Sequence, residues 1–171
     1  IKILLEILDE HKKIGILSPC SPRWGEFNLL NDFETKYFWF IHNCAYLVRR
    51  EFIEAICNFN EINEMKFFFD GENFRGYGSE HEIIAKAYAN DWSAAITKRV
   101  KAIENETHLL EKSALIKTDP YERNLKLYIE EGKLWMRNKY GFNCHWSMQQ
   151  YAKNFYDQFF EYNRELSIYR I

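Results

Sequence analysis

Apolar positions in the first part of the chain follow a helix period and then a strand pattern. Residues 1–12 carry apolar side chains at spacings of three and four, which predicts a helix that packs onto a sheet. A continuous apolar run over 14–18 predicts a buried strand, which Pro19 and Pro22 should end. The next segment, 20–36, has no clear period and is longer than a plain connection. We therefore expect an irregular loop there with a functional or covering role.

The middle of the chain alternates between strand-like and helix-like patterns. Aromatic and β-branched residues favour strands, and polar or glycine-containing stretches separate the segments. The predicted elements are strands over 37–41 and 45–49, a helix over 50–57, a short buried segment over 67–69, a helix over 80–90, and strands over 93–97 and 100–103. This mixture predicts an α/β fold.

Helical spacing dominates in the last third of the chain. Asp119 and Pro120 are residue types preferred at a helix start, so a helix should run over 120–138 and end at Gly141. A last helix over 145–163 carries an aromatic stripe. Its members are Tyr151, Phe155, Phe159 and Tyr162. The stripe predicts packing against the preceding helix, with a homodimer face or a membrane-surface face as the alternative.

The change of pattern after residue 104 suggests how the chain is organised. Residues 1–104 form the predicted α/β portion, and residues 105–171 form a C-terminal helical extension that begins with a helical segment over 107–115. A chain of 171 residues is long enough for one domain or a part of a larger one. Because the first residue is not Met, we expect the chain to be a portion of a longer protein.

The start of the central helix gathers the densest polar chemistry. Ser79 and Glu82 have the spacing of a capping box, and Glu82 with Lys86 has the spacing of an outward-facing ion pair. Glu80 then lies in the first turn, where the helix dipole favours a negative charge. Gly76 and Gly78 allow the preceding loop to approach a ligand closely. Glu80 is therefore a candidate catalytic carboxylate, and dipole compensation is the alternative.

Charge and cysteine content limit the partners and the compartment. A net charge of -2 argues against a nucleic-acid partner, which would favour a basic surplus. No apolar run approaches the roughly 20 residues of a membrane span. The four cysteines form no Cys-x-x-Cys pair, which is typical of reduced thiols in a cytoplasmic protein.

A zinc site is an alternative use of some of these thiols. Cys144 and His145 are adjacent, and Cys44 and His42 form a second Cys/His group upstream. Zinc binds such ligands in proteins, although this spacing matches no standard zinc motif.

Several side chains of the chain are of types that bind small ligands. Trp24, Tyr77 and Trp92 are able to stack on sugar faces, and Arg75 is able to pair with a phosphate. His42 is either an acceptor contact or a histidine packed at a strand end. His81 adjoins the candidate base, and a surface or satisfied histidine is the alternative. Gly78 is expected to form part of a substrate-binding loop.

Several segments occur in a recognisable order. They are Ile14-Gly15-Ile16-Leu17-Ser18-Pro19, Cys44-Ala45-Tyr46-Leu47-Val48-Arg49-Arg50-Glu51-Phe52, Phe59-Asn60-Glu61, Arg75-Gly76-Tyr77-Gly78-Ser79-Glu80-His81-Glu82, the helix and strand over 83–97, and Lys133 to Gly141. Their order and spacing resemble the acceptor-side half of family-two glycosyltransferases with the GT-A fold. The resemblance covers residues 1–141 and implies the C-terminal portion of a mixed GT-A sheet with flanking helices.

The resemblance also implies roles for single residues. The catalytic carboxylate of the family falls on Glu80, where the family usually has Asp, and the next acidic position falls on Glu82. Asn43 stands where the family has a small residue beside the acceptor site. His108 is the nearest match to a metal-binding histidine that often follows the last strand. The family position before the carboxylate is commonly acidic, and here it is Ser79.

The family resemblance defines the expected reaction and its requirements. It implies an inverting transferase with a nucleotide-sugar donor, a glycan or other hydroxyl acceptor, and a divalent Mn or Mg ion. In the family, a donor-binding half with an Asp-x-Asp metal motif precedes this segment, and the present chain contains no Asp-x-Asp. The alternative is a non-catalytic α/β interaction domain that binds a partner or itself through its aromatic helices. A glycosidase built on Glu80 and Glu82 is disfavoured because residues two apart on a helix do not face each other.

Overall fold

The computed structural model describes residues 1–42, 45–57, 72–73, 75–103 and 120–171. Within these residues, a four-stranded mixed sheet has the strand order β2-β4-β1-β3. The strands are β1 (Ile14–Cys20), β2 (Thr35–Tyr37), β3 (Leu47–Val48) and β4 (Ser93–Lys101). The helices are α1 (Lys2–Glu10), α2 (Arg50–Ile56), α3 (Ser79–Ala89), α4 (Tyr121–Tyr140) and α5 (His145–Tyr162), with short 3-10 helices η1 (Gly25–Leu29) and η4 (Arg164–Tyr169). The prediction of an α/β fold is confirmed at this level.

The centre of the sheet is the parallel pair β1 and β4. All seven residues of β1 are buried, which is typical of a strand covered on both faces. The edge strands β2 and β3 both run antiparallel to their neighbours. The first five residues of β4, from Ser93 to Thr97, are buried as well. The continuous apolar run over 14–18 therefore reflects its central place in the sheet.

The predicted bounds of several strands are wrong. Pro19 does not end β1, because pairing with β3 stops at Leu17 and the strand has an open edge beyond that point, where proline is tolerated. Phe38 and Ile41 are buried but lie outside any strand, so their apolar character reflects core packing. The two strands predicted over 93–103 are the single strand β4.

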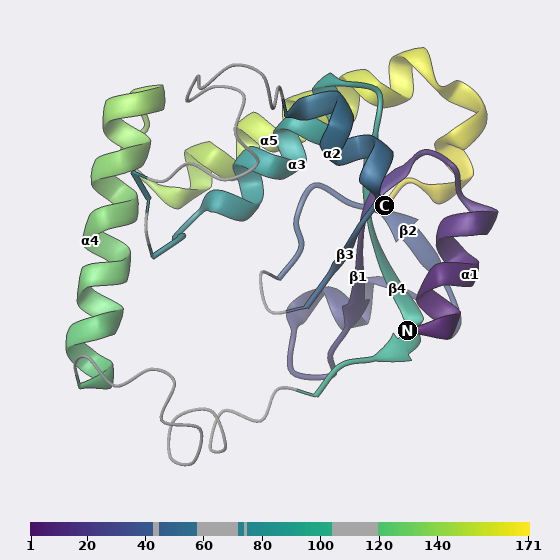
Figure 1. Cartoon of the computed structure of the whole chain (residues 1–171), viewed down its shortest axis with the longest axis horizontal. Coiled ribbons are helices and arrows are strands. Elements are labelled where there is room, and N and C mark those ends of the chain that lie inside the picture. The colour runs from purple at the N-terminus through teal and green to yellow at the C-terminus, as the bar shows by residue number, and fades with distance from the viewer. Residues whose placement is uncertain (43–44, 58–71, 74, 104–119) are drawn as a thin grey trace.

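The last helix packs on the central one. Figure 1 shows α5 and α3 side by side over the sheet, and the two helices contact each other along their lengths. Phe159 of the aromatic stripe is buried, Phe155 is half-buried and Tyr162 is exposed. The predicted packing on the preceding helix is confirmed for Tyr151, whose ring centroid lies 5.5 Å from that of Tyr140 in α4. The stripe also contacts α3, with the Tyr88 and Phe159 ring centroids 5.3 Å apart.

The C-terminal segment contributes to the same hydrophobic core as the sheet. Ala152, Tyr156 and Phe160 of α5 join the core cluster that also contains residues of α1, β1 and β4. The proposed division at residue 104 lies outside the described residues and stays a prediction. No helix in the described part of the chain has both the length and the apolar composition needed to cross a membrane.

Helix α4 stands on the side of the molecule remote from α1, next to the segment that leads into α3 (Figure 1). Trp135 and Met136 of α4 form a second small core with Met148 of α5. Gly141 ends α4 with a left-handed φ of 72°, as predicted. The helix therefore lies where it is able to cover the start of α3.

Candidate functional site

The loop before α3 is shaped by two glycines and an asparagine. Gly76 and Gly78 have φ values of 80° and 82°, which residues with a side chain rarely adopt. The Asn73 side chain accepts a hydrogen bond from the Gly76 amide and donates one to the Tyr77 carbonyl. These contacts fix the direction in which the chain enters the helix.

The predicted capping box does not form. Gly78 is the residue before the helix, and the Ser79 hydroxyl donates to the carbonyl of Gly76 at 2.8 Å. Glu82 turns away from the helix start and is bonded to α4 instead. Because the glycine turn already satisfies Ser79, the helix begins without a side-chain cap.

Glu80 points into the protein and contacts two histidines. Glu80 is only 8% exposed. Its Oε1 atom lies 3.3 Å from Nε2 of His145 and 3.1 Å from Nδ1 of His81. Burial raises the pKa of the Glu80 carboxyl, but the hydrogen bond from His145 and the adjacent His81 ring outweigh it and lower the pKa to about 2. The carboxyl is therefore ionised at neutral pH.

Several polar atoms of this cluster lack a hydrogen-bond partner among the described residues. His81 is completely buried, and both of its ring nitrogens are unpartnered, because its 3.1 Å approach to Glu80 lacks hydrogen-bond geometry. The Oε2 atom of Glu80 is also buried and unpartnered. Buried polar groups normally find partners, so these atoms make the cluster a candidate binding site.

A row of rings links this cluster to the N-terminal loop. The contacts are Trp24–His42 at 4.4 Å, His42–Phe40 at 5.2 Å, Phe40–His81 at 5.5 Å, His81–His145 at 4.5 Å and His145–Tyr77 at 4.9 Å between centroids. The structure thus brings together five residues that the sequence singled out, and they come from three segments of the chain. They are Trp24, His42, Tyr77, Glu80 and His81. We name this row and Glu80 the ring cluster.

Other predicted site residues have different surroundings. Arg75 makes a 2.6 Å ion pair with Glu131 of α4, so its guanidinium is engaged within the chain. Gly78 lies beside the ring cluster, since a Cβ there would stand 3.6 Å from the His145 ring. Trp92 packs near Phe52 in the core instead of joining the cluster. Asn43 and His108 lie outside the described residues.

The prediction that Glu82 and Lys86 mark an outward face of α3 is wrong. The Glu82–Lys86 pair exists at 3.7 Å, but Glu82 is 2% exposed. Helix α4 covers it: the Tyr140 hydroxyl donates to its carboxylate, and Lys139 lies 2.9 Å away. Glu82 therefore fixes α4 to α3 and has partners separate from those of Glu80.

The close contact between α4 and the loop rests on a glycine. A Cβ atom at Gly132 would lie 2.5 Å from the Tyr77 Cβ and 2.7 Å from its carbonyl oxygen. Alanine in a helix interior gains about 1 kcal/mol over glycine, whereas overpacking at a buried position such as Gly132 costs about 1–3 kcal/mol. We expect Gly132→Ala to lower the melting temperature, measured by calorimetry. Lys133→Ala, on the adjacent exposed position, serves as the control, and a rise for Gly132→Ala would contradict the contact.

The predicted Cys/His zinc site does not form among the described residues. His42 pairs with Glu26 at 3.2 Å and stacks on Trp24, while His145 faces Glu80. Cys144 is exposed and contacts the Ser147 hydroxyl at 3.4 Å. Cys44 lies outside the described residues.

The cysteine environments predict selective labelling. Hydrogen bonds from the side chain and backbone of Ser147 lower the pKa of Cys144, whereas burial raises the pKa of Cys20 to about 12. Because the thiolate is the reactive form, iodoacetamide at neutral pH should modify Cys144 well before Cys20. Peptide mass spectrometry at several pH values measures the order. Ser147→Ala should slow labelling at Cys144 alone, and equal rates at both cysteines would contradict the prediction.

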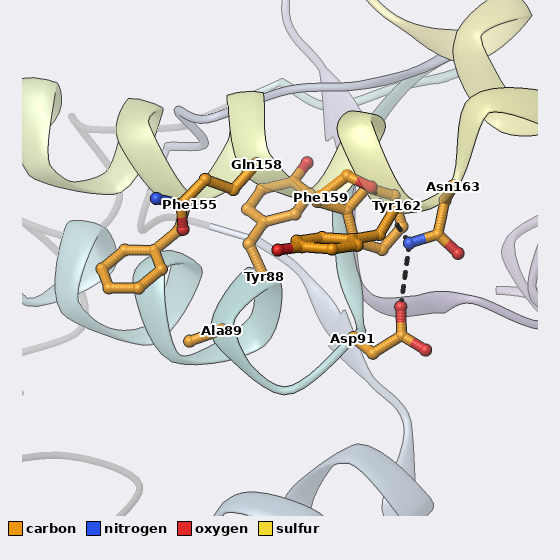
Figure 2. Close-up of a pocket in the computed structure, with 8 residues that line it drawn as sticks. All are labelled: Tyr88, Ala89, Asp91, Phe155, Gln158, Phe159, Tyr162 and Asn163. Carbon is orange, nitrogen blue, oxygen red and sulfur yellow. Dashed lines mark hydrogen bonds between the residues drawn. The ribbon is translucent and has the colours of Figure 1, made fainter.

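A pocket of about 370 Å³ lies at the other end of α3 from Glu80. Figure 2 shows Tyr88 and Ala89 of α3 facing Phe155 and Phe159 of α5 across it. Its acidic residue, Asp91, is bonded to Lys13 and accepts a hydrogen bond from Asn163. None of the predicted site residues lines this pocket, so we place the candidate chemistry at the ring cluster.

Sequence reasoning missed the role of His145. It stands 65 positions after Glu80, and it was considered only together with Cys144. Tyr46 was also missed: burial and the nearby Glu80 charge raise its pKa. No local pattern marks either residue, because both meet Glu80 only through the tertiary fold.

Comparisons with protein-family models, curated proteins and solved structures find no match to this chain.

Proposed function

We propose that this chain is the acceptor-side portion of an inverting, nucleotide-sugar-dependent glycosyltransferase. The observation that carries the proposal is the ring cluster, in which a row of rings connects Trp24 and His42 of the N-terminal part of the chain to the histidines that contact Glu80. Aromatic faces next to a buried carboxylate suit a sugar acceptor, whose ring stacks while a hydroxyl meets the carboxylate. The resemblance of residues 1–141 to family-two glycosyltransferases supports the same assignment.

In this proposal Glu80 is the general base. The acceptor oxygen attacks the anomeric carbon of the donor, its proton moves to the Glu80 carboxylate, and the bond to the nucleoside diphosphate breaks with inversion. A positioned base contributes about 10²- to 10⁴-fold. Oε2 of Glu80, which is buried and has no hydrogen-bond partner among the described residues, is the atom available for that proton.

The histidines set the strength of the base. With both in place, the pKa of Glu80 is about 2, which makes its carboxylate a weak proton acceptor. Burial acts in the opposite direction and would remain if an acceptor hydroxyl replaced the His145 hydrogen bond. The His145 hydrogen bond is one cause of the low pKa, so an acceptor hydroxyl that replaced it with a weaker hydrogen bond would raise the pKa of Glu80.

The metal implied by the resemblance fits this chain poorly. Magnesium and manganese favour oxygen ligands, and the group of three closely spaced ligands in the described residues supplies two imidazoles and one carboxylate. The chain also contains no Asp-x-Asp. We therefore assign the diphosphate contacts of the donor to a part of the protein outside this chain, and the proposal contains no step through a metal.

Transfer by the full-length protein tests the function. The protein would be incubated with a panel of nucleotide sugars and glycan acceptors, and the release of nucleoside diphosphate and the anomeric configuration of the product would be measured. We expect acceptor-dependent release and an inverted product. A retained configuration, or release that no acceptor stimulates, would contradict the proposal.

The alternative function is a non-catalytic interaction domain. Leu134 of α4 and Trp146 of α5 favour it, because they are 58% and 66% exposed. Since α5 contributes to the core, deleting it would disturb the fold, and substitution is the better test. If the chain forms a homodimer through these helices, Leu134→Ser with Trp146→Ser should convert it to a monomer in light scattering. An unchanged molecular mass would contradict a homodimer that forms through these two helices.

A further inference from the structure

We propose that Glu80, His81 and His145 form a binding site for one divalent transition-metal cation, with zinc as the ion that suits the ligands. The inference goes beyond the proposed function, because metal binding by this chain is measured without any transfer reaction. The three residues each offer one ligand atom, and these atoms lie within 4.8 Å of one another. They come from the first turn of α3 and the first residue of α5.

The spacing of the ligand atoms matches a coordination shell. Oε1 of Glu80 stands 3.1 Å from Nδ1 of His81 and 3.3 Å from Nε2 of His145. Atoms bound to one zinc at about 2.0–2.2 Å and at tetrahedral angles stand roughly 3.3–3.5 Å apart. The two separations are therefore close to two edges of such a shell, and the third pair of ligand atoms lies within 4.8 Å.

The unpartnered nitrogens of His81 are the second, independent observation. The side chain is fully buried, and neither ring nitrogen has a hydrogen-bond partner among the residues the structure describes. A buried imidazole without partners is costly, and a cation bound to one nitrogen would remove part of that cost. Ion binding thus accounts for a buried histidine that the described neighbours leave without a hydrogen bond.

The ligand types indicate the class of ion. Imidazole suits zinc, copper, iron and nickel, whereas magnesium and calcium favour all-oxygen shells. Two histidines and one glutamate are also the ligands of several catalytic zinc sites, in which a fourth position stays open. The 26% exposure of the His145 side chain places the accessible edge of the cluster at that residue.

Neighbouring rings hold the histidines in place. The His145 ring stacks on Tyr77 at an interplanar angle of 27°, and Phe40 packs on His81. The two imidazoles are perpendicular, with centroids 4.5 Å apart. Packing of this kind orients ligands before an ion arrives, which favours tight and stoichiometric binding.

Zinc titration of the chelator-stripped full chain tests the site. Competition against a chromophoric chelator should give one zinc per chain, and cobalt substitution should give visible absorption of a low-symmetry nitrogen and oxygen site. His145→Ala and Glu80→Gln should each weaken zinc binding by at least about 100-fold, since even outer-shell changes cost about 10- to 100-fold. His145 is the main position, because it is partly exposed and its truncation leaves the core intact.

Matched variants separate this site from adventitious binding. Cys144→Ser changes the exposed neighbour of His145, and Glu122→Gln changes an exposed glutamate in the first turn of α4. Both should leave zinc affinity within about twofold of the original. Absence of stoichiometric zinc binding, or unchanged affinity in folded His145→Ala, would overturn the proposal, as would loss of binding in Cys144→Ser. Zinc binding without sugar transfer would refute only the proposed function, and transfer without zinc binding would refute only the metal site.

Discussion

Replacing Glu80 by glutamine should lower sugar transfer by the full-length protein at least about 100-fold, the lower bound for loss of a general base. Glutamine keeps the size of the side chain and an oxygen able to accept the His145 hydrogen bond, but it cannot take a proton from an acceptor hydroxyl. The loss should therefore appear in kcat, while the KM for the donor changes little. Initial rates of nucleoside diphosphate release at varied donor and acceptor concentrations measure both constants.

The control for this variant is Glu122→Gln. Glu122 also lies in the first turn of a helix, α4, but it is exposed. A general effect of removing a negative charge from a helix start would appear in both variants. We expect transfer by Glu122→Gln to stay within about twofold, as for most exposed substitutions. Turnover by Glu80→Gln equal to that of the control would show that Glu80 has no catalytic part.

Replacing Glu82 by alanine should destabilise the fold by about 3 kcal/mol, in the range for breaking a buried ion pair. Its carboxylate accepts a hydrogen bond from Tyr140 and lies 2.9 Å from Lys139, and these contacts join α4 to α3. For a domain of this size, such a loss corresponds to roughly 6–12 °C in melting temperature. Calorimetry gives the shift, and hydrogen exchange should show faster exchange in α4 than in β1.

Glu130→Ala is the matched control for Glu82→Ala. Glu130 forms an i,i+4 pair with Lys126 at 3.8 Å, and both side chains are more than half exposed. Exposed pairs of this kind contribute about 0.2–1 kcal/mol. A shift for Glu82→Ala no larger than that of Glu130→Ala would refute the role of Glu82 as the buried link between the two helices.

Helix α4 supports the loop and the helix start that carry Glu80. Its contacts at Arg75, Tyr77 and Glu82 all fall on the loop and first turn that carry Glu80. Loosening α4 would free that loop, so Gly132→Ala and Glu82→Ala should disturb the orientation of Glu80 as well as the stability of the fold. The proposed base is therefore supported by a helix that supplies none of the atoms facing its carboxylate.

The sequence by itself determined the elements whose cause is local. The periods over 1–12, 50–57 and 145–163 predicted α1, α2 and α5 closely, because each helix buries one side of its own residues. The apolar run over 14–18 predicted a central strand, and Gly141 predicted the end of α4. Glu80 was singled out because a glycine-rich loop leads directly into an acidic helix start.

Only the tertiary structure decided which residues surround Glu80. Ser79 and Glu82 fit a capping box in the sequence, but the Gly78 turn and the contact with α4 give both residues other partners. His145 reaches Glu80 across 65 positions, a pairing set by the packing of α5 on α3. Local patterns record the preference of each segment, whereas burial and the pairing of charges depend on segments far apart in the chain. For that reason the sequence indicated one carboxylate, and the fold placed two histidines and a row of rings beside it.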